Sequence, residues 1–141
     1  MSPRLTFLLV IAGLLAVPTA ASAATKNGIT PLAPKAGSTV PTGKRPTMKM
    51  RVNGPGQVWL RVCKTKAKRT DGVICNDPAH QPEAIGRARK KSGVFQFKPR
   101  YYDFPAFWLN SPGVYYWQAY RIACGGGDCL QESPITRFKV G

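Results

Sequence analysis

The chain has 141 residues, with 21 Lys and Arg against 6 Asp and Glu, and its formal charge of +15 opposes compaction. Aromatic and β-branched residues occur in alternating runs, which excludes an intrinsically disordered chain. The length allows one domain and not two.

The first 23 residues have the three-part layout of a secretory signal. Arg4 precedes an apolar run from Leu5 to Val17, Pro18 ends that run, and Ala21-Ser22-Ala23 supplies small residues for cleavage. The run is too short to span a hydrocarbon core of about 30 Å. We therefore expect a cleaved signal peptide over 1–23 and a secreted, extracellular protein, with an uncleaved anchor as the alternative. The remainder carries 20 basic and 6 acidic side chains, a charge of +14.

The next segments predict β-structure. Residues 24–28 are expected to form a flexible leader, and 29–141 a single β domain. Segment 29–40 contains Pro31, Pro34 and Gly37, so it suits an edge strand or an extended lead-in. From Arg45 the two-residue period of a half-buried strand begins, with Met48, Met50 and Val52 alternating with Lys49 and Arg51.

A turn signal at 53–56 separates this strand from a second alternating segment, in which Val58, Leu60 and Val62 share one face. The basic loop 64–69 then leads to a short strand at Val73–Cys75. Residues 76–91 show little periodicity and predict a loop, with one helical turn over 83–89 as an option. Segment 93–98 predicts a strand with a bulge.

The C-terminal part contains the clearest strand, 114–123, which is apolar on both faces and opens after a turn at 111–113. Residues 125–127 are three glycines and predict a bend, and 135–140 predicts a closing strand. No segment keeps a 3.6-residue period. About seven short strands separated by turns predict an all-β fold, an antiparallel two-sheet sandwich.

The sequence resembles the fibronectin type III and immunoglobulin-like modules of secreted bacterial proteins. The resemblance rests on the prolines and glycine of 31–40, on Arg45–Met50, and on 109–117 followed by 136–140. It implies a β-sandwich that binds or spaces other molecules, with a tyrosine corner at Tyr115 or Tyr116. The family places an aromatic residue and a tryptophan in the second strand, where this chain has methionines. We therefore expect the core centre to be filled by Trp59, Trp108 or Trp117.

Four cysteines form an even set, which predicts disulfides in an oxidising compartment. Cys124 and Cys129 flank a glycine-rich turn, and Cys63 and Cys75 end two segments joined by the basic loop. Pairing 63 with 75 and 124 with 129 is favoured among three connectivities. A zinc site would need closely spaced cysteines or several histidines, and His80 is the sole histidine, so no metal or other cofactor is expected.

Nothing in the sequence predicts catalysis. The six acids stand singly, mostly in turns, where Asp commonly bonds its own backbone, so a glycosidase-type pair is not expected. His80 lies in a loop between prolines and is interpreted as a solvated residue. No nucleophile elbow, phosphate loop or dinucleotide motif is present, so neither enzyme activity nor a small-molecule substrate is expected.

Two basic runs carry the functional prediction. Their candidate anion-binding residues are Lys64, Lys66, Lys68 and Arg69 in the first run and Arg87, Arg89, Lys90 and Lys91 in the second. Arg61, Lys98, Arg100 and Arg121 are expected to join them on one surface. The alternative interpretation is a surface kept soluble by charge, with lysines that protect sheet edges. Aromatic residues within 101–108 either pack on the core or stack on a ligand.

We therefore expect a non-catalytic module whose basic loops contact an anionic polymer outside the cell. Candidate partners are teichoic acid, sulfated glycan, extracellular nucleic acid and a phospholipid surface. Binding of this kind weakens steeply with salt, because counterion release drives it. A second hypothesis is a protein-binding module, such as a protease inhibitor presenting the loop between Cys63 and Cys75. A third is a passive envelope or spacer protein.

Overall fold

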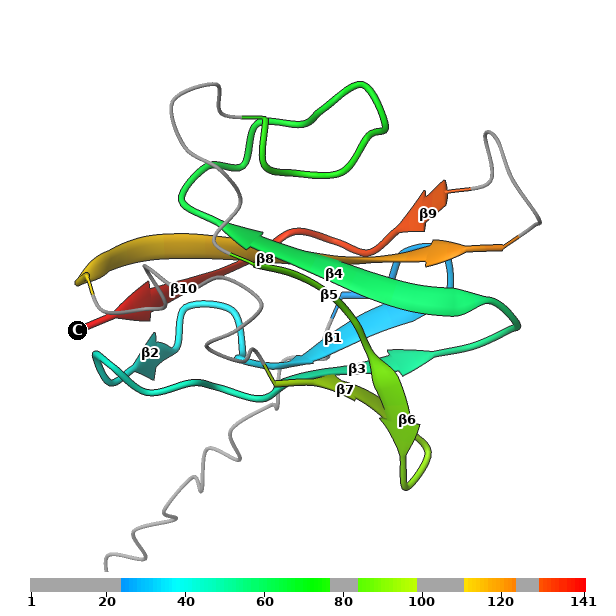
Figure 1. Ribbon diagram of the computed structural model, residues 1–141, viewed down its shortest axis with the longest axis horizontal. Helices are drawn as coiled ribbons and strands as arrows, with labels where there is room; N and C mark the ends of the chain where they lie inside the picture. Colours follow the sequence, from blue (N-terminus) through cyan, green and yellow to red (C-terminus); the bar gives the residue numbers. More distant parts are fainter. Residues whose placement is uncertain (1–23, 77–83, 99–110, 124–129) are drawn as a thin grey trace, which may run out of the picture.

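The computed structural model describes residues 24–76, 84–98, 111–123 and 130–141. All regular structure within these ranges is β. Ten strands form one sheet of four strands and one sheet of six, so the all-β prediction is confirmed and the expected strand number of about seven is too low (Figure 1). The predicted signal peptide lies outside the described ranges.

The four-stranded sheet, called sheet A, is antiparallel in the order β1-β3-β7-β6. Its strands are β1 (Ile29–Ala33), β3 (Met48–Val52), β6 (Arg89–Lys91) and β7 (Val94–Phe97). The predicted alternation in β3 is confirmed, because Met48 and Met50 are buried while Lys49 and Arg51 are exposed. One face of sheet A therefore meets the core and the other meets water.

The six-stranded sheet, sheet B, has the order β2-β10-β8-β4-β5, with β9 also paired to β8. Its strands are β2 (Thr39–Val40), β4 (Gln57–Cys63), β5 (Ala84–Arg87), β8 (Gly113–Ile122), β9 (Leu130–Glu132) and β10 (Thr136–Val140). β2 runs parallel to β10, whereas the other pairings are antiparallel. Strands β1 and β2 both lie at sheet edges, as the prolines of 29–40 predicted.

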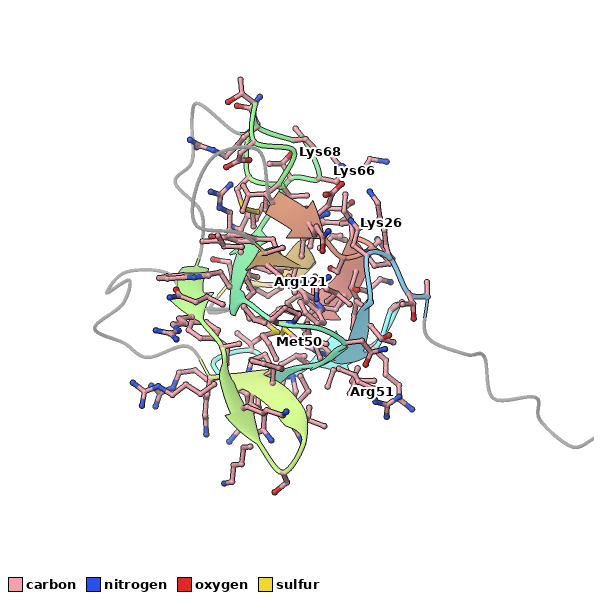
Figure 2. All side chains as sticks on the ribbon, turned by 90° about the vertical axis from the view of Figure 1, so that its right-hand side faces the viewer. Lys26, Met50, Arg51, Lys66, Lys68 and Arg121 are labelled. Atoms are coloured by element: carbon pink, nitrogen blue, oxygen red, sulfur yellow. A yellow bond between two sulfur atoms is a disulfide. The ribbon has the colours of Figure 1, made fainter. Side chains whose placement is uncertain are left out.

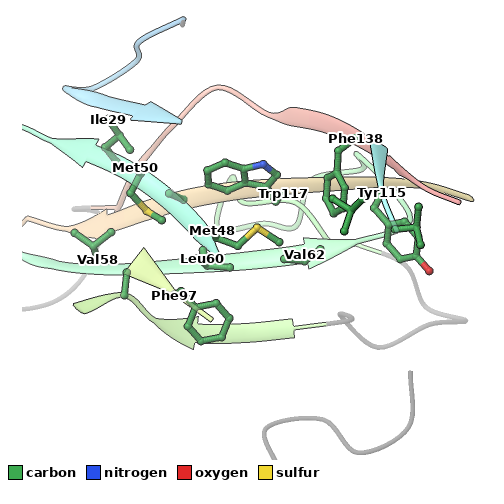
Figure 3. Close-up of a cluster of buried hydrophobic side chains, with 14 residues drawn as sticks. Ile29, Met48, Met50, Val58, Leu60, Val62, Phe97, Tyr115, Trp117 and Phe138 are labelled. Atoms are coloured by element: carbon green, nitrogen blue, oxygen red, sulfur yellow. The ribbon is translucent and has the colours of Figure 1, made fainter. Parts of the chain in front are cut away.

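The core lies between the two sheets (Figure 3). Met48 and Met50 from sheet A pack in one cluster with Leu60, Trp117 and Phe138 from sheet B. Trp117 is fully buried, as predicted, and its Nε1 donates a hydrogen bond to the Pro34 carbonyl at 3.3 Å. The two methionines share the centre with Trp117, a contribution that the prediction did not include.

The other two tryptophans do not join this cluster in the described residues. Trp59 lies on the opposite face of β4 and is half-buried, and Trp108 lies outside the described ranges. Tyr115 rather than Tyr116 points into the core, and its hydroxyl donates to the Ser111 carbonyl at 2.9 Å.

The prediction of a loop over 76–91, with an optional helical turn over 83–89, is wrong where the structure describes it. β5 pairs with β4 in sheet B, and β6 pairs with β7 in sheet A. The chain changes sheets at Ala88, which is buried and donates its N–H to the Val58 carbonyl at 2.8 Å. β6 has the sequence Arg-Lys-Lys and is fully exposed, so it shows no apolar period that a sequence pattern could reveal.

Two smaller predictions are also wrong. Val73–Cys75 is not a strand; a single bridge joins Lys68 to Ile74 there. The bulge expected in 93–98 is absent, since β7 keeps a continuous register with both neighbours. The register shift in sheet A lies instead in β1, between Pro31 and Ala33. Pro31 has no backbone N–H to donate, which favours an irregularity at that edge.

Gly86 on β5 is required by the packing between the sheets. A Cβ built there would lie 1.9 Å from the ring of Phe97, which is a core residue of β7. We expect Gly86→Ala to lower the free energy of unfolding by roughly 1–3 kcal/mol, because the ring must leave its position. Urea denaturation measures this.

The double variant Gly86→Ala/Phe97→Leu identifies the cause. Removal of the ring relieves the clash, so the pair is expected to lose less stability than the two single variants summed. Strict additivity would contradict the packing explanation.

Candidate functional site

The structure does not bring the two predicted basic runs together. Residues 64–69 lie in the loop after β4, whereas Arg87 belongs to β5 and 89–91 form β6. Figure 1 shows the loop at one end of the molecule and the β6–β7 hairpin projecting at the other. The perpendicular view agrees, with Lys66 and Lys68 far from that hairpin (Figure 2).

The loop that carries the first run is closed by the predicted disulfide. Cys63 and Cys75 are bonded, with their Cα atoms 5.6 Å apart. Within the loop the Arg69 N–H donates to the Val73 carbonyl at 2.8 Å, and the Asn76 N–H donates to the Ala67 carbonyl at 2.9 Å. The prediction for Cys124 and Cys129 lies outside the described residues.

Gln118 of β8 fastens this loop to the outer face of sheet B. Its side-chain oxygen accepts from the Ile74 N–H at 3.0 Å, and its amide donates to the Ser133 carbonyl at 2.8 Å. Gln118 is 1% exposed, so both groups need these partners. No sequence pattern indicates this role, because a glutamine in a strand is ordinarily solvated. The loop therefore covers the face of β8 that turns away from the core.

Asp71 and Glu132, the acids within the described ranges, both lie near this loop. Asp71 accepts from the Arg61 guanidinium at 2.9 Å, and Glu132 from Lys26 at 2.6 Å. The run's own Lys68 stands 3.5 Å from Glu132, and its Arg69 stands 3.9 Å from Asp71. Two of the four loop cations predicted to bind an anion are thus already beside a carboxylate.

Both carboxyl groups have lowered pKa values. Burial by itself raises the pKa of Asp71, but the Val73 N–H and the Arg61 guanidinium outweigh it and bring that pKa below its ordinary value of 3.8. For Glu132 the hydrogen bond from Lys26 is the largest cause and lowers the pKa below 4.5. Both groups are therefore ionised at neutral pH and hold their cations.

Two other arginines expected on the binding surface have structural roles instead. The Arg61 guanidinium lies over the Tyr120 ring, 5.4 Å from its centroid, and pairs with Asp71. Arg121 is 9% exposed, so the expectation that it joins the surface is wrong. It donates to the carbonyls of Asn53 and Asn27 and to the side chain of Gln131, which ties the β3–β4 turn to sheet B.

The outer face of sheet A carries cations that neither described acid offsets. Lys49 and Arg51 of β3 and Arg89 and Lys91 of β6 are exposed, and we call these four the sheet A cations. The strands of sheet A contain no Asp or Glu. Within the described part of the chain none of the four makes an ion pair. Figure 2 shows Arg51 directed away from the body, toward solvent.

β7 runs between the two pairs of sheet A cations. Gln96 pairs with Lys49 on one side and with Arg89 on the other. By continuation of this register the next row consists of Arg51, Val94 and Lys91. Strands lie about 4.8 Å apart and alternate residues about 6.7 Å apart along a strand, so the four backbone positions span roughly 10 by 7 Å.

The sequence prediction named Arg89 and Lys91 but missed Lys49 and Arg51 as binding candidates. Their alternation with methionines predicts the solvated face of a strand, and their exposure in β3 confirms it. The missing fact was the pairing of β6 with β7, which brings that face beside the second basic run. Lys98 follows β7 and is exposed, and Arg100 lies outside the described ranges.

The described residues contain no cluster of metal-ligating side chains. No group of three or more His, Cys, Asp or Glu within them could hold a metal ion. His80 and the acids Asp77, Glu83, Asp103 and Asp128 lie outside those ranges, as do the aromatic residues of 101–108. No helix that is long and apolar enough for a membrane span occurs in the described part.

Comparisons with known proteins add no relative, since no family model, curated protein or solved structure matches this chain.

The ion pairs of Glu132 predict a loss of stability in acid. The pKa of Glu132 is lower in the folded state than in the unfolded state, where it is about 4.5. The ionised carboxylate therefore stabilises the fold fully above about pH 4.5. This stabilisation is lost as the pH falls through the pKa of the folded state. We expect Glu132→Gln to cost roughly 0.5–1 kcal/mol at pH 7 and almost nothing near pH 2.

Urea unfolding of both proteins at the two pH values measures this difference. Lys90→Gln, which removes an exposed charge without an ion pair in the described residues, is the control. An equal stability difference between Glu132→Gln and the unmodified chain at both pH values would contradict the prediction.

Proposed function

We propose that this chain is a secreted, non-catalytic binding module that holds an anionic polymer outside the cell. The unpaired sheet A cations are the observation that carries the proposal. Like charges placed this close repel one another, and a bound polyanion relieves the repulsion while releasing its own counterions. The described acids do not relieve this repulsion, because they lie near the loop of sheet B.

This proposal keeps Arg89 and Lys91 of the second basic run, adds Lys49 and Arg51, and leaves out the loop 64–69. Lys68 and Arg69 stand near carboxylates, and Lys64 lies over the Tyr115 ring, 5.6 Å from its centroid. Lys66 is the loop cation with no such neighbour among the described residues. The loop therefore presents less free positive charge than its sequence indicates.

A fibronectin type III or immunoglobulin-like sandwich is the proposed architecture. In immunoglobulin domains one sheet has strand order A-B-E-D and the other G-F-C, extended by C′. The order β1-β3-β7-β6 corresponds to the first, and β10-β8-β4-β5 to the second. The hydrogen bond from Tyr115 to Ser111, at the start of β8, supports a tyrosine corner.

Secretion is part of the proposal. The apolar N-terminal run with its small-residue cleavage site supports export. The Cys63–Cys75 bond supports an oxidising compartment, where disulfides persist.

The protease-inhibitor hypothesis has weaker support. An inhibitory loop presents an extended backbone to its protease, whereas Ala67 and Arg69 are held in a closed hairpin by hydrogen bonds to Asn76 and Val73. Lys68 is bridged to Ile74 within the same hairpin. The spacer hypothesis differs in requiring no ligand, and a binding measurement separates it from our proposal.

Binding of the 24–141 protein to teichoic acid, DNA and heparin across salt concentrations tests the proposed function. If four cations contact a flexible polyanion, a plot of log affinity against log salt is expected to have a slope of about −3. Fluorescence anisotropy with labelled polymers measures it. Absence of binding to every polymer at low salt would leave the spacer hypothesis in its place.

A further inference from the structure

The arrangement of the sheet A cations defines a strip rather than a diffuse patch. Lys49 and Arg51 form one side, Arg89 and Lys91 form the other, and β7 is the floor between them. On this floor the outward residues are Val94 and Gln96, both half-buried and without charge. A chain lying along β7 has cations on both of its sides.

The described residues of the strip offer no aromatic side chain on which a ring can stack. Phe95 and Phe97, the aromatic residues of β7, pack against the core. β1, β3 and β6 contain no aromatic residue. Nucleic-acid bases and sugar rings gain much of their affinity from stacking on aromatic side chains, so this strip offers them electrostatic attraction without that contribution.

The strip also lacks the apolar groups that anchor a protein in a membrane. Surface-bound proteins combine basic residues with exposed Trp, Phe or Leu side chains that enter the lipid. Among the described residues the exposed large apolar side chain is Ile122, at the end of β8 in sheet B. A lipid headgroup layer therefore matches this face less well than a single soluble chain does.

The spacing favours an anion that repeats along a thin polymer. Alternate residues on β3 and on β6 present charge about every 6.7 Å, on two lines roughly 10 Å apart. Two of the four cations are arginines, whose planar guanidinium groups bind phosphate oxygens in pairs. Gln96 adds amide donors between the lines, opposite Lys49 and Arg89.

We infer that an extended, unbranched phosphodiester polymer without stacking rings, of the poly(glycerol phosphate) kind, lies along β7 between the sheet A cations. Successive phosphates contact β3 on one side and β6 on the other. This inference rests on the proposed function and specifies its ligand class and its site.

Three double variants of equal composition test the site. Lys49→Gln/Arg51→Gln and Arg89→Gln/Lys91→Gln each remove one Lys and one Arg, two residues apart on an exposed strand face. The matched control is Arg137→Gln/Lys139→Gln on β10, which removes the same two residue types at the same spacing from sheet B. All three pairs make no ion pair within the described residues and change the charge equally.

Synthetic poly(glycerol phosphate) is the probe, and affinity is measured from about 0.05 to 0.5 M salt. Each sheet A variant is expected to make the log–log salt slope shallower by about 1.4, because two phosphate contacts are lost. That change corresponds to roughly 25-fold weaker binding at 0.1 M salt, and the β10 control is expected to remain within about twofold of the unmodified protein. Thermal unfolding of each variant verifies that the fold is retained.

The outcomes separate the inference from the proposed function. Equal losses in all three variants would show that total charge matters and the β7 strip does not, which overturns the inference. Tighter binding to a single-stranded oligonucleotide of equal phosphate number, to heparin or to anionic vesicles than to poly(glycerol phosphate) would also overturn it, while polyanion binding stands. Failure to bind any of these probes at low salt would remove the proposed function itself.

Discussion

Burial of β8 on both faces is the constraint on which the rest of this structure depends. Its inner residues Tyr115 and Trp117 belong to the core, while Gln118 on the opposite face is sealed beneath the disulfide loop. A strand buried on both sides needs polar partners for every polar group it carries. The loop 63–76 and the Ser133 region supply these on the outer side.

The loop that covers β8 determines where the described carboxylates lie. The described acids lie where the loop meets sheet B and pair with Lys26 and Arg61. Among the described residues sheet A has no covering loop and no acid in its strands, so its outer face keeps four cations to which no described carboxylate is paired. The fold thus places the described carboxylates on one side of the molecule and the sheet A cations on another. This arrangement creates the surface on which the proposed function depends.

Strands that bury one face could be predicted from the sequence, because alternation in β3, β4 and β10 records directly which residues leave water. β5 and β6 could not. β5 pairs with β4, which is distant in sequence. β6 pairs with the adjacent β7, but Arg89–Lys91 is exposed throughout, so no apolar period exists there. For the same reason the sequence predicts the basic site in the two runs 64–69 and 87–91, where cations cluster along the chain, and does not reveal that β3 adds Lys49 and Arg51 to the second run.

The chain's own order of residues determined the all-β class and the buried faces of the long strands, and it favoured an edge position for 29–40 and a bond between Cys63 and Cys75. These properties depend on patterns that span a few residues, or on two cysteines separated by one loop. Tertiary structure alone decided that Met48 and Met50 share the core with Trp117, that Arg121 is enclosed, and which cations remain without a carboxylate. Those outcomes depend on contacts between segments that are distant in sequence, and local periodicity does not specify such contacts.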